Sequence, residues 1–227
     1  MIIYGKQLLL YILENYPKKL QKVYLAKKCD QKLFNRLKRV CENVVLVDNK
    51  KAQALSRGGN HQGFIAQIED LEFGDFNEVK KGTFLLILWG ITDVGNLGAI
   101  VRSAYAFGVD SIIISGVKSV NLEAMIRTSS GAIFDIPIVL YSDALSLLNE
   151  LKQAGFGTFG ADMSGVDVKE VNFSTKTALM MGSEGEGIPP KIKNKLDRLI
   201  SIKMAREFDS LNVSAATAIL CDRIVNG

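Results

Sequence analysis

The chain has 227 residues, of which 48% are hydrophobic and 23% charged. This suffices for one large or two small globular domains and argues against disorder. Three cysteines without a CxxC spacing argue against a disulfide framework or a zinc site and fit a reducing compartment. Because no apolar run is long enough to cross a bilayer and no signal-peptide pattern opens the chain, we expect a cytoplasmic protein.

The net charge of +4 is unevenly distributed along the chain. Residues 1–81 hold 15 Lys and Arg against 9 Asp and Glu, whereas residues 82–227 hold 13 against 15. The densest part, residues 18–57, has 12 basic and 3 acidic residues. Such a block is equally compatible with a solvated surface and with a binding surface for a polyanion.

The first segment shows short alternating helix and strand patterns. In chain order they are a helix at 5–16, a strand at 22–26, a basic amphipathic helix at 31–41, and strands at 43–48 and 61–68. These elements predict a small α/β domain over residues 1–70. The acidic, glycine-punctuated stretch that follows lacks periodicity and predicts a linker at 71–82.

The second segment, residues 83–227, alternates apolar runs with helical patterns. Strands are expected at 84–89, 111–115, 136–140, 156–161, 178–182 and 199–202, and helices at 96–107, 121–130, 143–154, 190–196 and 211–225. Strands this apolar, alternating with helices, predict a mostly parallel sheet covered on both faces. Ligands of such sheets bind at the carboxyl ends of the strands, which directs attention to the loops at 90–96, 161–166, 182–189 and 203–211.

The first of these loops opens into "GNLGAIVRSAYAFG", residues 95–108. A dinucleotide fold requires G-x-G-x-x-G here and an acidic residue at the end of the second strand. The chain offers only a G-x-x-G, and its second strand ends at Ser115 without an acid. A nicotinamide-dependent oxidoreductase therefore stays a distant alternative. Arg102 lies about a turn and a half along this helix from Asn96, so both side chains could face one ligand.

Two further loops carry polar residues. In "GSEGEGIPPKI", residues 182–192, three glycines let the backbone approach a ligand, and Glu184 and Glu186 suit a cation or a hydroxyl better than a phosphate. An ordinary turn explains this loop equally well. In "DSLNVSAATAIL", residues 209–220, we expect Asp209 or Ser210 to cap the last helix, with Asn212 in its first turn.

Together and in this order, these motifs resemble the TrmH (SpoU) branch of the SPOUT methyltransferases. The matching stretches are "NLGAIVRSAYAFG", "SSGA", "MGSEGEGIP" and "ISIKMAREFDSLNVSAATAIL", and the resemblance covers residues 83–227. The first segment, with "IYGKQLLLYIL" and "HQGFIAQI", more loosely resembles the ribosomal-protein-like RNA-binding domain of the branch that methylates a guanosine in 23S ribosomal RNA.

The resemblance implies transfer of a methyl group from S-adenosyl-L-methionine to a ribose 2′-hydroxyl of RNA. It also implies a deep trefoil knot in the C-terminal SPOUT domain and a homodimer. The catalytic residues that it implies are Arg102, Asn96, Glu184, Ser210 and Asn212. Arg102 would bind the neighbouring phosphate and lower the pKa of the hydroxyl, or act as the base, a role for which a guanidinium is awkward.

The backbone of three further residues matches the cofactor contacts of that family: Gly182, Ile202 and Leu211. The chain departs from the family pattern at Val94 and Lys203, where proline is usual, and at 206–209, where small residues are usual. These departures bear on the rim of the cofactor site. A tRNA substrate and a non-catalytic RNA-binding protein on the same fold remain the alternatives.

Overall fold

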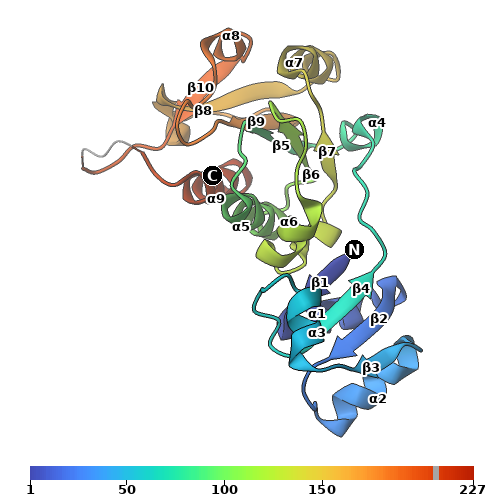
Figure 1. Cartoon of the computed structure of the whole chain (residues 1–227). Coiled ribbons are helices and arrows are strands. Elements are labelled where there is room, and N and C mark those ends of the chain that lie inside the picture. The colour runs from blue at the N-terminus through green and yellow to red at the C-terminus, as the bar shows by residue number, and fades with distance from the viewer. Residues whose placement is uncertain (207–209) are drawn as a thin grey trace. The chain divides into compact units, whose positions relative to one another are not determined.

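The computed structural model describes residues 1–206 and 210–227, which form two compact units (Figure 1). Unit 1 consists of Met1–Glu72 together with Leu122–Gly131. Unit 2 consists of Phe73–Asn121 together with Ala132–Gly227. The domain ranges expected from the sequence stay a prediction.

Helix α6 (Leu122–Thr128) belongs to unit 1, although the chain segments before and after it belong to unit 2. It contacts β1 (Ile2–Tyr4), and the Arg127 guanidinium lies 4.8 Å from the centre of the Tyr4 ring. A cation over an aromatic face is attracted by the ring quadrupole. No sequence pattern indicated this grouping, because it depends on contacts between segments more than 100 residues apart.

Unit 1 is a four-stranded sheet in the order β1-β4-β2-β3. Its further elements are β2 (Leu20–Leu25), β3 (Val44–Leu46), β4 (Phe64–Ile68), α1 (Lys6–Asn15), α2 (Gln31–Val40) and α3 (Asn49–Leu55). Strand β4 is antiparallel to β1 and β2, and β2 is parallel to β3. The ends of β1, β2 and β3 therefore lie at the same end of the sheet as the start of β4. Strand β1 and helix α3 were not expected, since three and seven residues are too short to show a period.

Unit 2 contains a six-stranded sheet in the order β10-β8-β9-β5-β6-β7, and every neighbouring pair is parallel. The strands are β5 (Phe84–Trp89), β6 (Ser111–Ser115), β7 (Ile138–Leu140), β8 (Gly157–Asp167), β9 (Thr177–Met181) and β10 (Arg198–Ser201). The expected parallel sheet is thus confirmed. All six carboxyl ends meet at one edge, where a ligand site is expected.

Helices cover both faces of this sheet (Figure 1). The helices of unit 2 are α4 (Phe76–Val79), α5 (Val94–Ala106), α7 (Ala144–Gln153), α8 (Pro190–Lys193) and α9 (Val213–Asn226). Helices α5 and α9 pack against each other on one face, and α7 and α8 lie on the other. Ile87 and Ile113 of the sheet pack with Leu147 and Leu151 of α7 in a buried cluster. Burial on both faces explains why these strands are apolar throughout.

Two segments differ from the sequence expectation. Strand β8 continues to Asp167 instead of ending near 161, and its pairing with β10 shifts register between Gly160 and Val166, as in a β-bulge. Within the expected linker, α4 packs Phe76 edge-on against Tyr141, with ring centres 4.8 Å apart. The linker thus includes a structured turn that is too short to show a helical period.

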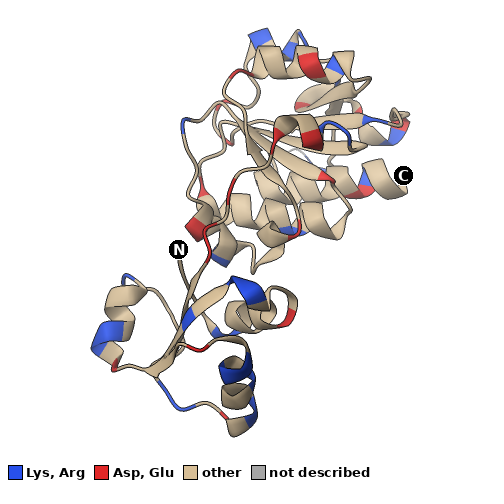
Figure 2. Ribbon diagram, turned by 90° about the vertical axis from the view of Figure 1, so that its right-hand side faces the viewer, with Lys and Arg blue, Asp and Glu red and all other residues tan. Residues whose placement is uncertain are grey.

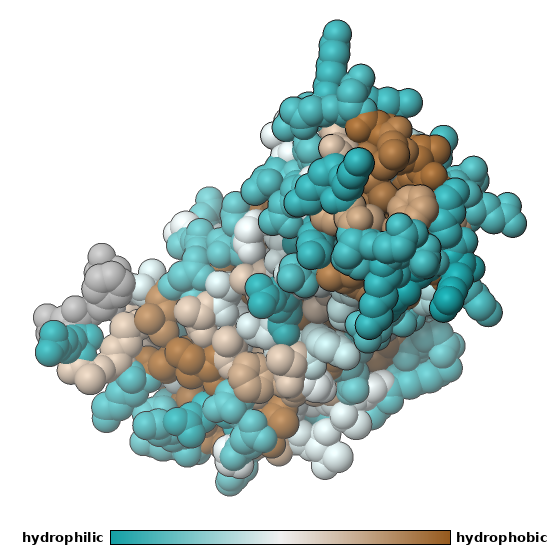
Figure 3. Space-filling view, turned by 90° about the horizontal axis from the view of Figure 1, so that it is seen from below, coloured by the Kyte–Doolittle hydropathy of each residue, from teal (hydrophilic) through white to brown (hydrophobic). Residues whose placement is uncertain are grey.

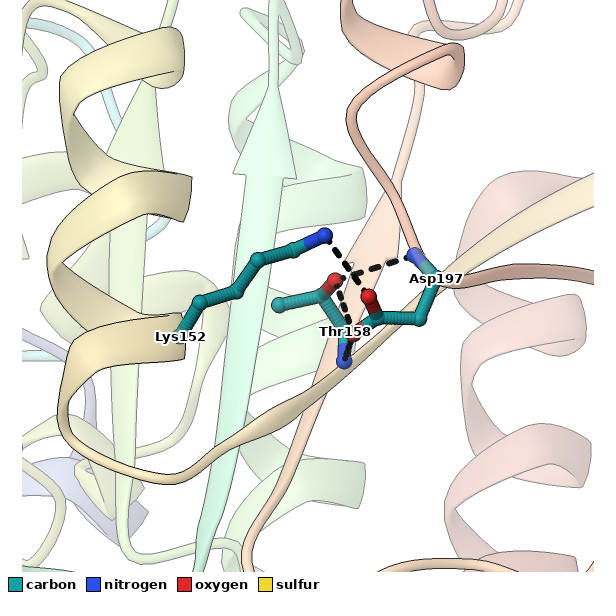
Figure 4. Close-up of polar contacts among 3 residues, drawn as sticks. All are labelled: Lys152, Thr158 and Asp197. Atoms are coloured by element: carbon teal, nitrogen blue, oxygen red, sulfur yellow. Dashed lines mark hydrogen bonds and ion pairs between the residues drawn. The ribbon is translucent and has the colours of Figure 1, made fainter.

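A polar cluster fixes the amino-terminal end of β8 (Figure 4). The backbone nitrogen and the hydroxyl of Thr158 both donate to Asp197, each at 2.8 Å, and Lys152 of α7 donates to the other carboxylate oxygen at 2.6 Å. Burial alone would raise the pKa of Asp197, but the hydrogen bonds from Lys152 and Thr158 outweigh it and hold that pKa below its usual value. The cluster joins α7, β8 and the entry to β10.

Candidate active site

A groove of about 1450 Å³ lies at the carboxyl ends of β8, β9 and β10. It is lined by residues from 161–167, 181–187 and 200–206, and by the start of α9. Three of the four loops singled out in the sequence therefore form its walls. The expected cofactor residues Gly182, Ile202 and Leu211 all line the groove, as do two of the expected catalytic residues, Glu184 and Ser210.

Glycine gives the loop after β9 its shape. A Cβ atom added at Gly182 would lie 2.2 Å from the carbonyl carbon of Gly187, a contact that real side chains do not make. Gly187 itself has a φ of 64° and donates its backbone N–H to Ser183 O at 2.9 Å. Pro189 then caps α8, as expected from the two prolines. The loop backbone therefore lines the groove without side-chain obstruction.

Three of the expected catalytic side chains form one hydrogen-bonded network. Asn96, at the start of α5, donates its Nδ2 to Glu184 Oε1 at 3.0 Å. Asn212 donates its Nδ2 both to the same oxygen, at 2.9 Å, and to Asn96 Oδ1, at 3.0 Å. These residues come from three separate segments that lie up to 116 positions apart in the sequence. The network joins the first loop of the unit to the rim of the groove.

Helix capping fixes the orientation of the Asn212 amide. Asn212 is the N-cap of α9, and its Oδ1 accepts from Ser214 N at 2.9 Å and from Ser214 Oγ at 2.6 Å. Its Nδ2 is therefore turned toward Glu184. The expectation that Ser210 or Asp209 caps this helix was wrong, because the helix begins at Val213 and the cap is the residue directly before it. Asp209 itself lies outside the described residues.

Arg102 lies apart from this network. It is exposed on α5, and within the described chain its side chain makes no hydrogen bond or ion pair. Ser210 is also exposed and lines the groove. The structure thus brings Asn96, Glu184 and Asn212 together, with Ser210 nearby on the groove wall, and leaves the guanidinium of Arg102 available to an anion.

The groove contains residues that the sequence did not single out. Lys193 of α8 forms an ion pair with Asp162. Burial would raise the pKa of Asp162, yet the hydrogen bonds from Lys193 and Ser164 keep it below its usual value. Met163 and Met204 add flexible apolar surface. Their loops could be identified from the sequence, but the individual side chains carried no distinguishing pattern.

The donor set and the lining suit S-adenosyl-L-methionine. Ile202, Met204 and Leu211 offer apolar contacts for a flat heterocycle, while the glycine loop offers backbone donors and acceptors. Acidic side chains on the rim suit a cationic ligand.

Among the described residues, no group of three or more His, Cys, Asp or Glu side chains is arranged to hold a metal ion. No helix of the described chain is long and apolar enough to cross a membrane.

The parallel sheet and the groove at its carboxyl edge define an α/β protein with a ligand site built from its last three strands. Residues 83–222 match the model of the SpoU rRNA methylase family, and residues 2–74 match a model described as RNA 2′-O ribose methyltransferase substrate binding. The chain therefore belongs to the SpoU rRNA methylase family.

Two proteins similar to this chain match it over nearly its whole length. It is 34% identical to the 23S rRNA (guanosine-2′-O-)-methyltransferase RlmB of Haemophilus ducreyi, over 98% of this chain and 96% of that protein. The SpoU methyltransferase AviRb of Streptomyces viridochromogenes, solved with AdoMet, has a TM-score of 0.83 at 20% identity and covers 99% of this chain and 89% of its own.

A second solved structure has the same fold. An AdoMet-bound rRNA methyltransferase from Sinorhizobium meliloti has a TM-score of 0.81 at 22% identity and covers 98% of this chain and 85% of its own. At this level of identity both structural likenesses concern the fold alone. The family assignment rests on the family model and on the relative from Haemophilus ducreyi.

Proposed function

We propose that the chain transfers a methyl group from S-adenosyl-L-methionine to the 2′-hydroxyl of a guanosine in 23S ribosomal RNA. The observation that carries the proposal is the network of Asn96, Glu184 and Asn212 at the rim of a groove lined by Gly182, Ile202 and Leu211. The relative from Haemophilus ducreyi, which shares its length and is named for this reaction, supports the substrate.

Gly182, Ile202 and Leu211 would hold the cofactor through backbone and apolar contacts. When bound, S-adenosyl-L-methionine supplies a methyl group on a positively charged sulfur, ready for in-line displacement. The chain must then position a nearly neutral 2′-hydroxyl and help it to lose its proton.

Arg102 provides that help through charge. A guanidinium remains protonated at any ordinary pH and binds phosphate through several donors, so Arg102 holds the phosphate next to the reacting ribose. Its positive charge lowers the pKa of the hydroxyl. The network of Asn96, Glu184 and Asn212 orients the ribose, and Ser210 contributes a further hydroxyl from the groove wall.

We further propose a cytoplasmic homodimer with a knotted C-terminal segment. The order β10-β8-β9-β5 supports the knot, because the chain crosses to the far edge of the sheet at β10 and returns to pack α9 on α5. Exposed apolar side chains on α5 and α9 support the dimer, namely Tyr105, Ile219 and Val225. Apolar surface is also visible among hydrophilic residues on the face drawn in Figure 3.

The substrate is tested by methyl transfer from labelled S-adenosyl-L-methionine to unmodified 23S rRNA and, separately, to unmodified bulk tRNA. The proposal predicts label on the rRNA and none above background on the tRNA. Methyl label on the tRNA alone would support RNA methylation but contradict 23S rRNA as the substrate. Absence of cofactor binding would overturn the proposed activity altogether and favour a non-catalytic RNA-binding protein.

A further inference from the structure

One end of the unit 1 sheet gathers much of the positive charge of that unit. Six exposed basic residues follow the ends of β1, β2 and β3 or lead into β4: Lys6, Lys27, Lys28, Lys50, Lys51 and Arg57. We call this surface the basic sheet end. Figure 2 shows Lys and Arg on several helices and loops of this unit.

Hydrogen bonds and side-chain contacts bring three separate segments together at the basic sheet end. Gln62 Oε1 accepts from the backbone N–H of Lys6 at 3.2 Å, which ties the loop before β4 to the start of α1. Ala26 N donates to Gly63 O at 2.9 Å. The side chain of Lys27 lies against Gly63, and its ammonium is 5.3 Å from the centre of the Phe64 ring. The lysines after β1 and β2 therefore flank one loop.

That loop, residues 57–63, is held in a defined shape. Arg57 and Gln62 have positive φ angles of 51° and 53°, which non-glycine residues adopt only when their surroundings impose it. The buried His61 accepts from Gly63 N at 3.0 Å through its Nδ1. The exposed amide side chains of Asn60 and Gln62 are thus presented from a fixed backbone.

The basic side chains of this surface are not held by neighbouring carboxylates. Asp30 and Asp48 lie nearby in the sequence, but each accepts a hydrogen bond at a helix N-terminus, from Leu33 N and Lys51 N. None of the six basic side chains forms an ion pair within the described chain. The opposite end of the sheet differs, because Lys19 there pairs with Glu69.

Helix α2 is the other basic surface of unit 1, and its charges have a local explanation. Lys38 and Arg39 occupy its last turn, where the helix dipole favours cations, and Lys38 Nζ donates to Glu42 O at 3.5 Å. Lys32 and Arg36 are exposed on a regular helix, where the amide side chains of Gln31 and Asn35 hydrogen-bond to each other at 2.9 Å. This surface resembles an ordinary solvated helix face.

We propose that the basic sheet end, and not helix α2, is the surface by which unit 1 holds RNA. Lys6, Lys28 and Arg57 contact phosphates, and the amides of Asn60 and Gln62 face the edges of unpaired bases. The inference rests on the proposed function, because it takes RNA to be the substrate.

The test compares two full-length variants with equal loss of charge. The sheet-end variant carries Lys6→Gln, Lys28→Gln and Arg57→Gln, and the matched control carries Lys32→Gln, Lys38→Gln and Arg36→Gln on α2. The dissociation constant for unmodified 23S rRNA is measured over a range of KCl concentrations, together with methyl transfer and cofactor affinity. Thermal melts verify folding, and the single change Lys28→Gln provides a milder variant.

The sheet-end variant is expected to bind this RNA roughly 10-fold or more weakly at physiological salt, with a salt slope reduced by about two to three, since each phosphate contact contributes roughly 0.7–0.9. Lys28→Gln should give about a third of the change in slope. The control should bind within about 3-fold of the wild type, and cofactor affinity should be unchanged in all variants.

An equal or larger loss of RNA affinity in the α2 variant would overturn the proposed RNA surface without contradicting the proposed methylation function. Selective loss of binding in the sheet-end variant, with no methyl transfer by any variant or the wild type, would support the surface and overturn the function.

Discussion

At the residue scale, Asn212 serves two roles with the two ends of one amide. Its oxygen caps α9, and its nitrogen donates to Glu184 and Asn96. Asn212→Asp keeps the capping oxygen but replaces the donor by a carboxylate facing Glu184. Because Asp caps helices about as well as Asn, we expect the free energy of unfolding to change by less than about 1 kcal/mol. Methyl transfer should fall about 100-fold, since the network loses its alignment.

The control for this change is Asn194→Asp, an exposed position at the end of α8 outside the groove, where activity should be unchanged. Adding Glu184→Gln to Asn212→Asp supplies a new donor opposite the carboxylate and should recover part of the activity. If Asn212→Asp retained full kcat, Asn212 would be a helix cap and nothing more.

Gly182 tests whether the backbone shape of the groove matters. In Gly182→Ala the new Cβ would meet the Gly187 backbone at 2.2 Å, so the loop must shift. We expect a loss of about 1–3 kcal/mol in unfolding free energy and at least a 10-fold weaker affinity for S-adenosyl-L-methionine by calorimetry. Gly185→Ala has open space at its Cβ and should leave the stability unchanged. Unaltered cofactor affinity in Gly182→Ala would remove this loop from the cofactor site.

At the element scale, the cluster at the start of β8 makes a measurable contribution to stability. The hydroxyl of the buried Thr158 donates to Asp197 Oδ2 at 2.8 Å and accepts from Asp197 N at 3.1 Å. Thr158→Val keeps the volume and removes both bonds, so we expect a loss of about 1–3 kcal/mol in denaturant unfolding at neutral pH. A change below about 0.3 kcal/mol would mean that water replaces the hydroxyl without cost.

The same cluster predicts a pH dependence. Because the folded state lowers the pKa of Asp197, its contribution to stability is present above the unfolded-state pKa and is lost as the pH falls through the folded one. The wild type should therefore lose more stability than Thr158→Val between about pH 5 and pH 2. Parallel stability curves for the two proteins over that range would contradict this assignment.

The elements of unit 2 were largely predictable, because most of its strands are apolar and its longer helices, α5, α7 and α9, are long enough to show their period. The prediction failed where local sequence carries little information. The three-residue β1 and the four-residue α4 are too short, and the extension of β8 to Asp167 passes through polar residues. The loops that form the groove followed from the parallel-sheet rule, whereas the dual role of Asn212 required the geometry.

At the scale of the whole molecule, the exposed apolar side chains of α5 and α9 predict a dimer. Tyr105 is 49% exposed and Val225 50%, so each of these helices presents a large apolar side chain on its outer surface. Light scattering should give a mass of about 50 kDa, twice that of the 24.9 kDa chain. Ile219→Lys combined with Val225→Lys should give a monomer, whereas Lys195→Ala with Arg198→Ala should not. A wild-type mass of one chain at micromolar concentration would rule out the dimer.

The proposed mechanism depends on the action of Arg102 on a ribose hydroxyl. It is tested by transferring labelled methyl groups to unmodified 23S rRNA with the wild type, Arg102→Ala, and Arg198→Ala, an exposed arginine at the far end of β10. We expect an alkali-resistant dinucleotide with the wild type and with Arg198→Ala. Arg102→Ala should lower methyl transfer by about 100-fold or more at unchanged cofactor affinity. Label that alkali releases as ordinary mononucleotides, or full activity without Arg102, would contradict the proposed mechanism.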